Sequence, residues 1–194
     1  MTYISRYDFA GLDEWNRIRG WFSIEKAIAM QRYVRRLPAG SRLVELGSYE
    51  GRSSVALAAV IPKDSVLYCV DHFEGSTEHH EVRLDVGGIF ESFLRNIERC
   101  GVRDTIRVLR SNTIDAANQF ADDSIDLLLH DASHDFDSVV ADLRVWYPKL
   151  KPHGWLFCDD YEEQWKGVID AVEHLGLTGH VEARSLWAHQ KPLA

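Results

Sequence analysis

The sequence predicts a single domain of the α/β class, with a doubly wound, mostly parallel sheet covered by helices. Short apolar runs alternate along the chain with amphipathic stretches of helical period, and no repeat interrupts them. Most of the apolar runs are nearly continuous, as is typical of strands buried on both faces. With 194 residues, 45% of them hydrophobic, the chain suits one well-covered core rather than two small ones.

Each element follows from its own stretch of pattern. Apolar runs predict strands at 43–46, 66–70, 106–109, 125–129 and 155–158, with one or two closing strands within 181–189. Helical periodicity predicts helices at 23–37, 52–60, 89–100, 113–120, 136–147 and 163–175. We therefore expect an N-terminal helical segment and candidate lid at residues 1–40 and a core at 41–194. Ligands of such sheets bind beyond the carboxyl ends of the strands.

Composition excludes several classes of partner. Thirty acidic against 22 basic residues give a formal net charge of -8, which disfavours nucleic acid. The three cysteines form no CxxC pair, so neither a disulfide framework nor a zinc knuckle is expected. Residues 1–20 carry charges throughout and show neither a signal peptide nor a membrane span. We expect a cytoplasmic protein without membrane or nucleic-acid partners, and leave open whether it forms a homo-oligomer.

A glycine turn follows the first predicted strand. The residues from Glu45 to Ser54 read ELGSYEGRSS and lead directly into a helix. Glycine allows positive φ and close approach of a ligand, and a helix start offers free N–H groups to a negatively charged group. Tyr49 breaks the G-x-G-x-x-G spacing, which counts against NAD and FAD. The alternative is a tight turn that binds nothing.

Polar residues also follow the second and third strands. Asp71 ends the second strand, 26 residues after Glu45, near the spacing at which an acid meets ribose hydroxyls in doubly wound folds. Its alternative is a solvated cap. Ser111 and Asn112 follow the third strand, where they could contact a base or simply form a turn.

Three carboxylates follow the fourth and fifth strands, at Asp131, Asp159 and Asp160. Neighbouring parallel strands would bring them together, and like charges about 4 Å apart repel by several kcal/mol at an effective dielectric of about 20. A divalent cation would neutralise them, Mg²⁺ first, with Mn²⁺ or Ca²⁺ open. The alternative is that one aspartate caps the helix near Phe136 while the others are solvated.

These motifs together resemble class I S-adenosylmethionine-dependent methyltransferases, in the metal-dependent O-methyltransferase branch called methyltransferase family 24. The glycine turn is similar to the E-L-G-x-Y-x-G-x-S form of catechol O-methyltransferase-like enzymes, and residues 71–76 to a D-x-F-x-G-S stretch. Residues 128–161 resemble the D-x-x-H and D-D-Y run of macrocin- and mycinamicin-type sugar O-methyltransferases.

The resemblance implies a Rossmann-like, seven-stranded sheet and S-adenosylmethionine as the cofactor. It implies a metal held by Asp131, Asp159 and Asp160, with Asp131 and His134 as catalytic residues. The implied cofactor contacts lie at or after the ends of four predicted strands and comprise Glu45, Gly47, Ser48, Tyr49, Gly51, Ser53, Asp71, His72, Ser111, Asn112 and Asp131.

The implied reaction is methyl transfer from S-adenosylmethionine to a hydroxyl of a sugar or a phenol. A cation would orient the acceptor and lower its pKa. His134 would take the proton, since an unperturbed imidazole has a pKa of about 6.5, unless it only caps the helix or lies in solvent. The alternatives are a metal-independent N- or carboxyl-methyltransferase and a non-catalytic S-adenosylmethionine-binding regulatory protein. The acceptor, the cation and the role of residues 73–88 stay open.

Overall fold

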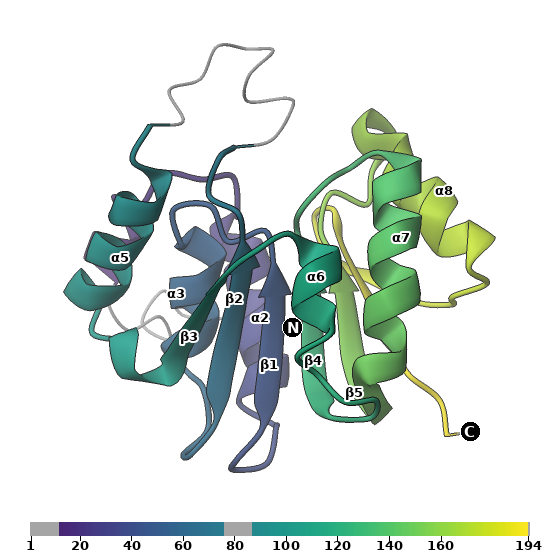
Figure 1. Cartoon of the computed structure of the whole chain (residues 1–194), viewed down its shortest axis with the longest axis horizontal. Helices are drawn as coiled ribbons and strands as arrows, with labels where there is room; N and C mark the ends of the chain where they lie inside the picture. The colour runs from purple at the N-terminus through teal and green to yellow at the C-terminus, as the bar shows by residue number, and fades with distance from the viewer. Residues whose placement is uncertain (1–11, 76–86, 194) are drawn as a thin grey trace.

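The computed structural model describes residues 12–75 and 87–193. Within this part of the chain, seven strands form one sheet in the order β3-β2-β1-β4-β5-β7-β6 (Figure 1). The predicted fold class is therefore confirmed. The strands are β1 (Arg42–Leu46), β2 (Val66–Asp71), β3 (Ile106–Arg110), β4 (Ile125–His130), β5 (Leu150–Cys158), β6 (His180–Ala183) and β7 (Leu186–Gln190).

The pairing is parallel from β3 across to β5, and β7 alone runs against its neighbours. β5 begins five residues earlier than the periodicity predicted, because Leu150 already pairs with Ile125 before a register shift. The parallel pairs bring the carboxyl ends of β1, β2, β4 and β5 to one edge of the sheet. Each motif singled out in the sequence follows one of these ends or the end of β3.

The helices confirm the predicted pattern with small changes at their ends. The α6 helix stops at Ala117 rather than near 120, and the last predicted helix begins with a 3-10 turn, Glu163–Trp165. A short helix, α1, precedes the first predicted one. The described α-helices are α1 (Leu12–Asn16), α2 (Ile24–Val34), α3 (Arg52–Ala58), α5 (Ile89–Arg99), α6 (Thr113–Ala117), α7 (Phe136–Trp146) and α8 (Lys166–His174).

Helices cover both faces of the sheet, as Figure 1 shows for α3 and α5 on one side and α6 and α7 on the other. Because successive residues of a strand point to opposite faces, Leu43 packs in the cluster with α2, α3 and α5, whereas Val44 packs in the cluster with α6, α7 and α8. Both residues are fully buried. This two-sided burial explains why the strands read as continuous apolar runs.

The segment expected to form a lid or connection, 73–88, falls largely outside the described residues, which omit 76–86. In the described ranges, none of the helices has the length and apolar character needed to cross a membrane.

Candidate functional site

One large cavity opens at the carboxyl edge of the sheet. Its volume is about 1080 Å³. Most of the residues predicted to bind a cofactor or a metal line it, and so do residues from α2, α6 and the segment before α2. The predicted residues among its walls are Gly47, Ser48, Tyr49, Ser53, Asp71, His72, Ser111, Asn112, Asp131, His134, Asp159 and Asp160.

The glycine turn is fixed against the neighbouring strands. Gly47 has φ 84°, and its N–H donates to the carbonyl of Val70 at 2.9 Å. A Cβ at this position would lie 2.0 Å from the carbonyl oxygen of Asp131. Only glycine can therefore occupy the position without displacing the loop that carries Asp131.

The two remaining residues of the predicted cofactor set, Glu45 and Gly51, do not line the cavity. The Glu45 carboxylate is fully buried beneath the turn and accepts hydrogen bonds from Ser48 Oγ at 2.7 Å and from Ser54 Oγ. Burial raises the pKa of this carboxyl, against the hydrogen bonds that lower it. Gly51 is the N-cap of α3 with φ 89°. Both residues hold the turn in shape rather than facing a ligand.

Asp71 is more constrained than the sequence suggested. Its Oδ2 accepts from the backbone N–H of Ser48 at 2.9 Å and of Tyr49 at 2.7 Å, and its Oδ1 accepts from Phe73 at 2.6 Å. A carboxylate offers about four lone-pair sites. One lone-pair site on Oδ1 is left. The carboxylate can therefore accept from one ribose hydroxyl, and not from two at once as expected.

Ser111 and Asn112 line the cavity at the start of α6. Asn112 is the N-cap of this helix, and its side chain accepts from the N–H of Asp115 at 2.8 Å. The prediction of a turn former is therefore confirmed for Asn112, and its role toward a base stays a prediction.

A buried polar network beside α6 was missed in the sequence. Thr113 Oγ1 donates to Asp142 Oδ1, and Asp142 Oδ2 lies 3.0 Å from His130 Nε2. Thr113 and Asp142 line the cavity, and His130 is buried at the strand end as expected. Asp142 is a polar residue on the buried face of α7. A carboxylate at an apolar position of the helical pattern was the only sequence signal for this network.

Arg52, at the end of the glycine turn, binds the segment that precedes α2. The Arg52 guanidinium donates to the carbonyls of Phe22 at 2.9 Å and Ile18 at 2.7 Å, and lies 3.8 Å from the ring centre of Trp15. Trp15 Nε1 donates in return to the Arg52 carbonyl at 2.7 Å. This contact joins the N-terminal segment to the turn. Trp21, which follows, is 66% exposed and forms part of the cavity wall.

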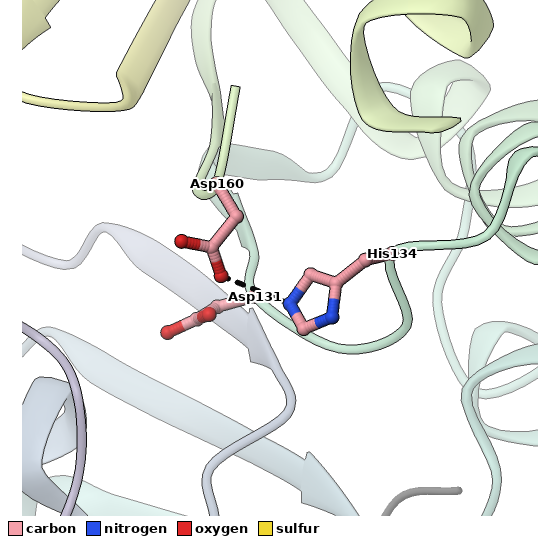
Figure 2. A group of neighbouring side chains, drawn as sticks. All are labelled: Asp131, His134 and Asp160. Atoms are coloured by element: carbon pink, nitrogen blue, oxygen red, sulfur yellow. Dashed lines mark ion pairs between the residues drawn. The ribbon is translucent and has the colours of Figure 1, made fainter. Parts of the chain in front are cut away.

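Three side chains that line the cavity converge, as Figure 2 shows. Asp131, His134 and Asp160 come from the ends of β4 and β5, and one ligand atom of each lies within 4.8 Å of the others. His134 Nε2 is 2.9 Å from Asp160 Oδ2. Asp160 has φ 56°, a left-handed conformation that aspartate tolerates better than most residues.

Asp159 does not belong to this group, so the group differs from the predicted metal-binding triad, which stays a prediction. Its Oδ1 is 2.6 Å from the ammonium of Lys26, in the first turn of α2, and also accepts from the N–H of Asp160 at 2.9 Å. Lys26 was missed because charged residues on a helix usually face solvent. The available signal was its place four residues before Met30, on the apolar face of α2.

The charges of this cluster affect one another strongly. Partial burial, together with Asp159 and Asp160, raises the pKa of Asp131 well above its ordinary value. Burial and the charge of Asp160 raise the pKa of Asp159 to about 6. Burial would also raise the pKa of Asp160, but the hydrogen bond from His134 and the charge of Lys26 hold it below its ordinary value. Burial disfavours the Lys26 ammonium, yet Asp159 and Asp160 raise its pKa overall.

The ring of His134 packs on Trp165, with the ring centres 4.4 Å apart, and its Nε2 faces the carboxylates. Neither alternative for this residue fits the geometry. Asp135, not His134 or Asp131, is the N-cap of α7, and its side chain accepts from the N–H of Ser138 at 3.0 Å. The His134 side chain is 18% exposed and lines the cavity rather than lying in open solvent.

Comparison with known sequences identifies similar proteins. The family model of methyltransferase family 24, described as a methyltransferase domain, matches residues 44–161. The uncharacterized protein y4gI of Sinorhizobium fredii is 31% identical over 129 residues, or 62% of this chain. The match spans 13% of that relative's length.

Solved structures share the fold at low sequence identity. A protein of Corynebacterium glutamicum superposes with a TM-score of 0.70 at 16% identity, covering 95% of this chain and 88% of that one. The O-methyltransferase NovP gives 0.72 at 19% identity, with 88% and 81% covered. TomG, an O-methyltransferase of Streptomyces achromogenes solved with S-adenosylmethionine, gives 0.66 at 15% identity, with 89% and 81% covered.

Proposed function

The chain belongs to methyltransferase family 24, and from this premise we propose that it transfers the methyl group of S-adenosylmethionine to a hydroxyl oxygen of a small molecule, with a divalent cation assisting. One observation carries the proposal. A single cavity is lined both by the glycine turn and Asp71 and by Asp131, His134 and Asp160. A cofactor and an acceptor can therefore meet inside one cavity.

The cofactor end offers groups suited to S-adenosylmethionine. The remaining lone pair of Asp71 can accept from one ribose hydroxyl, and His72 beside it lines the same wall. Ser53, buried at the start of α3, has a hydroxyl that can donate to the methionine carboxylate. Ser111, Asn112 and Ile114 line the region left for the adenine.

The acceptor end offers a base held in a fixed orientation. Methyl transfer needs an acceptor oxygen in line with the S–CH₃ bond and a group that takes its proton. His134 Nε2–H donates to Asp160, which orients the ring and leaves Nδ1 as the ring nitrogen that can take a proton, and Trp165 supports the ring face. Trp21, Trp165 and Gln164 all line the cavity, and the aromatic side chains suit a sugar or phenol ring.

The donor set at this end fits a divalent cation. Asp131 and Asp160 supply carboxylate oxygens and His134 an imidazole nitrogen, which Mn²⁺ accepts more readily than Mg²⁺ does. A bound cation would lower the pKa of the acceptor hydroxyl. If His134 is the base, Asp131 and Asp160 are the residues that hold the cation.

Metal-independent methyl transfer is the second candidate, and Lys26 favours it. Its ammonium already supplies one positive charge to the cluster, 2.6 Å from Asp159 and 3.6 Å from Asp160. Assays in EDTA and in Mg²⁺ separate the two candidates, because only the metal-dependent enzyme stops in chelator and recovers with added cation.

The test is release of S-adenosylhomocysteine against a panel of glycosides and catechols, with S-adenosylmethionine binding measured by calorimetry. We expect His134→Ala to lower turnover roughly 10² to 10⁴-fold while cofactor binding survives. His174→Ala is the matched control, since His174 lies on α8 outside the cavity wall. Stabilisation by NADH and not by S-adenosylmethionine would reject the proposal, and binding without turnover on any acceptor would favour a regulatory protein.

A further inference from the structure

A buried lysine lies at the acidic end of the cavity. Lys26 is 6% exposed and belongs to the first turn of α2, which Ser23 caps. Its ammonium is 2.6 Å from Asp159 Oδ1 and 3.6 Å from Asp160 Oδ1. The lysine therefore contacts Asp159, which lies beside the candidate cation site, and reaches Asp160, which belongs to that site.

The lysine decides which carboxylates are available to a cation. Asp159 Oδ1 accepts from both the ammonium and the N–H of Asp160, and Asp159 is not among the groups that converge. The three groups that do converge are Asp131, His134 and Asp160. Three carboxylates and one ammonium leave a formal charge of −2, with the imidazole neutral, which one divalent cation balances.

We propose that Lys26 is a positioning residue and an internal counter-cation, which holds Asp159 out of the ligand set and weakens binding of a divalent cation by Asp131, His134 and Asp160. The inference rests on the proposed function, because it concerns the same acidic cluster. It deepens that function by predicting a weakly held, exchangeable cation. Even at an effective dielectric of about 20, two like charges a few ångströms apart repel strongly enough to change an affinity by more than tenfold, so the effect should be measurable.

Binding of Mn²⁺ in the absence of cofactor and acceptor tests this directly, with the free ion followed by its electron paramagnetic resonance signal. Lys26→Met removes the charge and keeps a side chain of similar length, so we expect Mn²⁺ to bind roughly tenfold tighter or more. Lys26→Arg keeps the charge and should stay within about threefold of the parent. Equal or weaker binding in Lys26→Met, or no Mn²⁺ binding in any variant, would overturn the inference.

Lys26→Met leaves Asp159 buried without its ion-pair partner, which can prevent folding. A second pair of variants avoids this problem. In Asp159→Leu the lysine keeps only Asp160, whereas Lys26→Met with Asp159→Leu has neither member of the buried pair. We expect the double variant to bind Mn²⁺ at least tenfold tighter than Asp159→Leu, and equal affinities would overturn the inference. Circular dichroism confirms that each variant is folded.

The same experiment separates this inference from the proposed function. Turnover in EDTA would reject metal assistance but leave the difference in Mn²⁺ affinity as evidence for Lys26. Turnover that requires Mg²⁺, with no affinity difference between parent and Lys26→Met, would support the proposed function and reject the role of Lys26.

Discussion

Asp71→Asn should destabilise the protein before any cofactor is present. The carboxylate accepts from three backbone N–H groups at 2.6–2.9 Å, on Ser48, Tyr49 and Phe73. Asparagine has one acceptor oxygen and one NH₂ group, so at least one N–H donor would face another donor. The shape of the side chain is otherwise unchanged.

The size of the effect follows from these bonds. A hydrogen bond to a charged group contributes about 1.5 to 3 kcal/mol, and a donor left without an acceptor adds to the loss. We therefore expect Asp71→Asn to lower the free energy of unfolding by about 2 to 4 kcal/mol. For a chain of this length that corresponds to a fall in Tm of roughly 5 to 15 °C.

Urea unfolding followed by circular dichroism, without cofactor, measures this loss, and calorimetry measures the affinity for S-adenosylmethionine. The affinity should also fall, because Asp71 positions the backbone of the glycine turn. Asp64→Asn is the control, since Asp64 is 73% exposed at its side chain and asparagine tolerates its φ of 60°. An Asp71→Asn protein as stable as the parent, with weaker cofactor binding, would show that the carboxylate acts on the ligand and does not hold the turn.

Two further predictions concern the glycine turn and the acidic cluster. Gly47→Ala should cost at least about 3 kcal/mol of stability, because its Cβ would meet the Asp131 carbonyl at 2.0 Å. Gly176→Ala, with φ 65° and open space around it, should cost about 1 kcal/mol. Similar losses for the two variants in urea unfolding would contradict this geometry. A carboxyl whose pKa rises from 3.8 to about 6 on folding, as for Asp159, stabilises the fold fully at low pH and loses this contribution as pH increases through about 6. In chelator, the free energy of unfolding should therefore rise by about 1 kcal/mol between about pH 7 and pH 5, and Asp159→Asn should reduce the rise; an unchanged slope would contradict the assignment.

Local pattern was sufficient to predict the sheet. The runs around Leu43 and Leu127 are apolar at successive positions because helices cover both faces of the sheet. The sequence pattern alone therefore predicts that these strands are buried on both faces. Once the strands were placed, their carboxyl ends placed Gly47, Asp71, Asp131 and Asp160 at one edge. The candidate site was therefore predictable as a set of strand ends.

Contacts between distant segments were not predictable in the same way. Lys26 and Asp159 are separated by most of the chain, and the sequence around each residue does not indicate that it pairs with the other. Arg52 likewise occupies a position that reads as an ordinary helix start, although its guanidinium binds three carbonyls of the preceding segment, among them Trp15 and Ile18.

By itself, therefore, the sequence determined the fold class, the glycine turn and the presence of carboxylates at neighbouring strand ends, because periodicity and glycine conformation are local properties. Only the tertiary structure decided what each carboxylate does. Asp71 turns to the backbone, Asp159 turns to Lys26, and Asp160 joins Asp131 and His134. The physical reason is that the direction and charge of a buried carboxylate depend on the donors and cations that the rest of the chain brings to it.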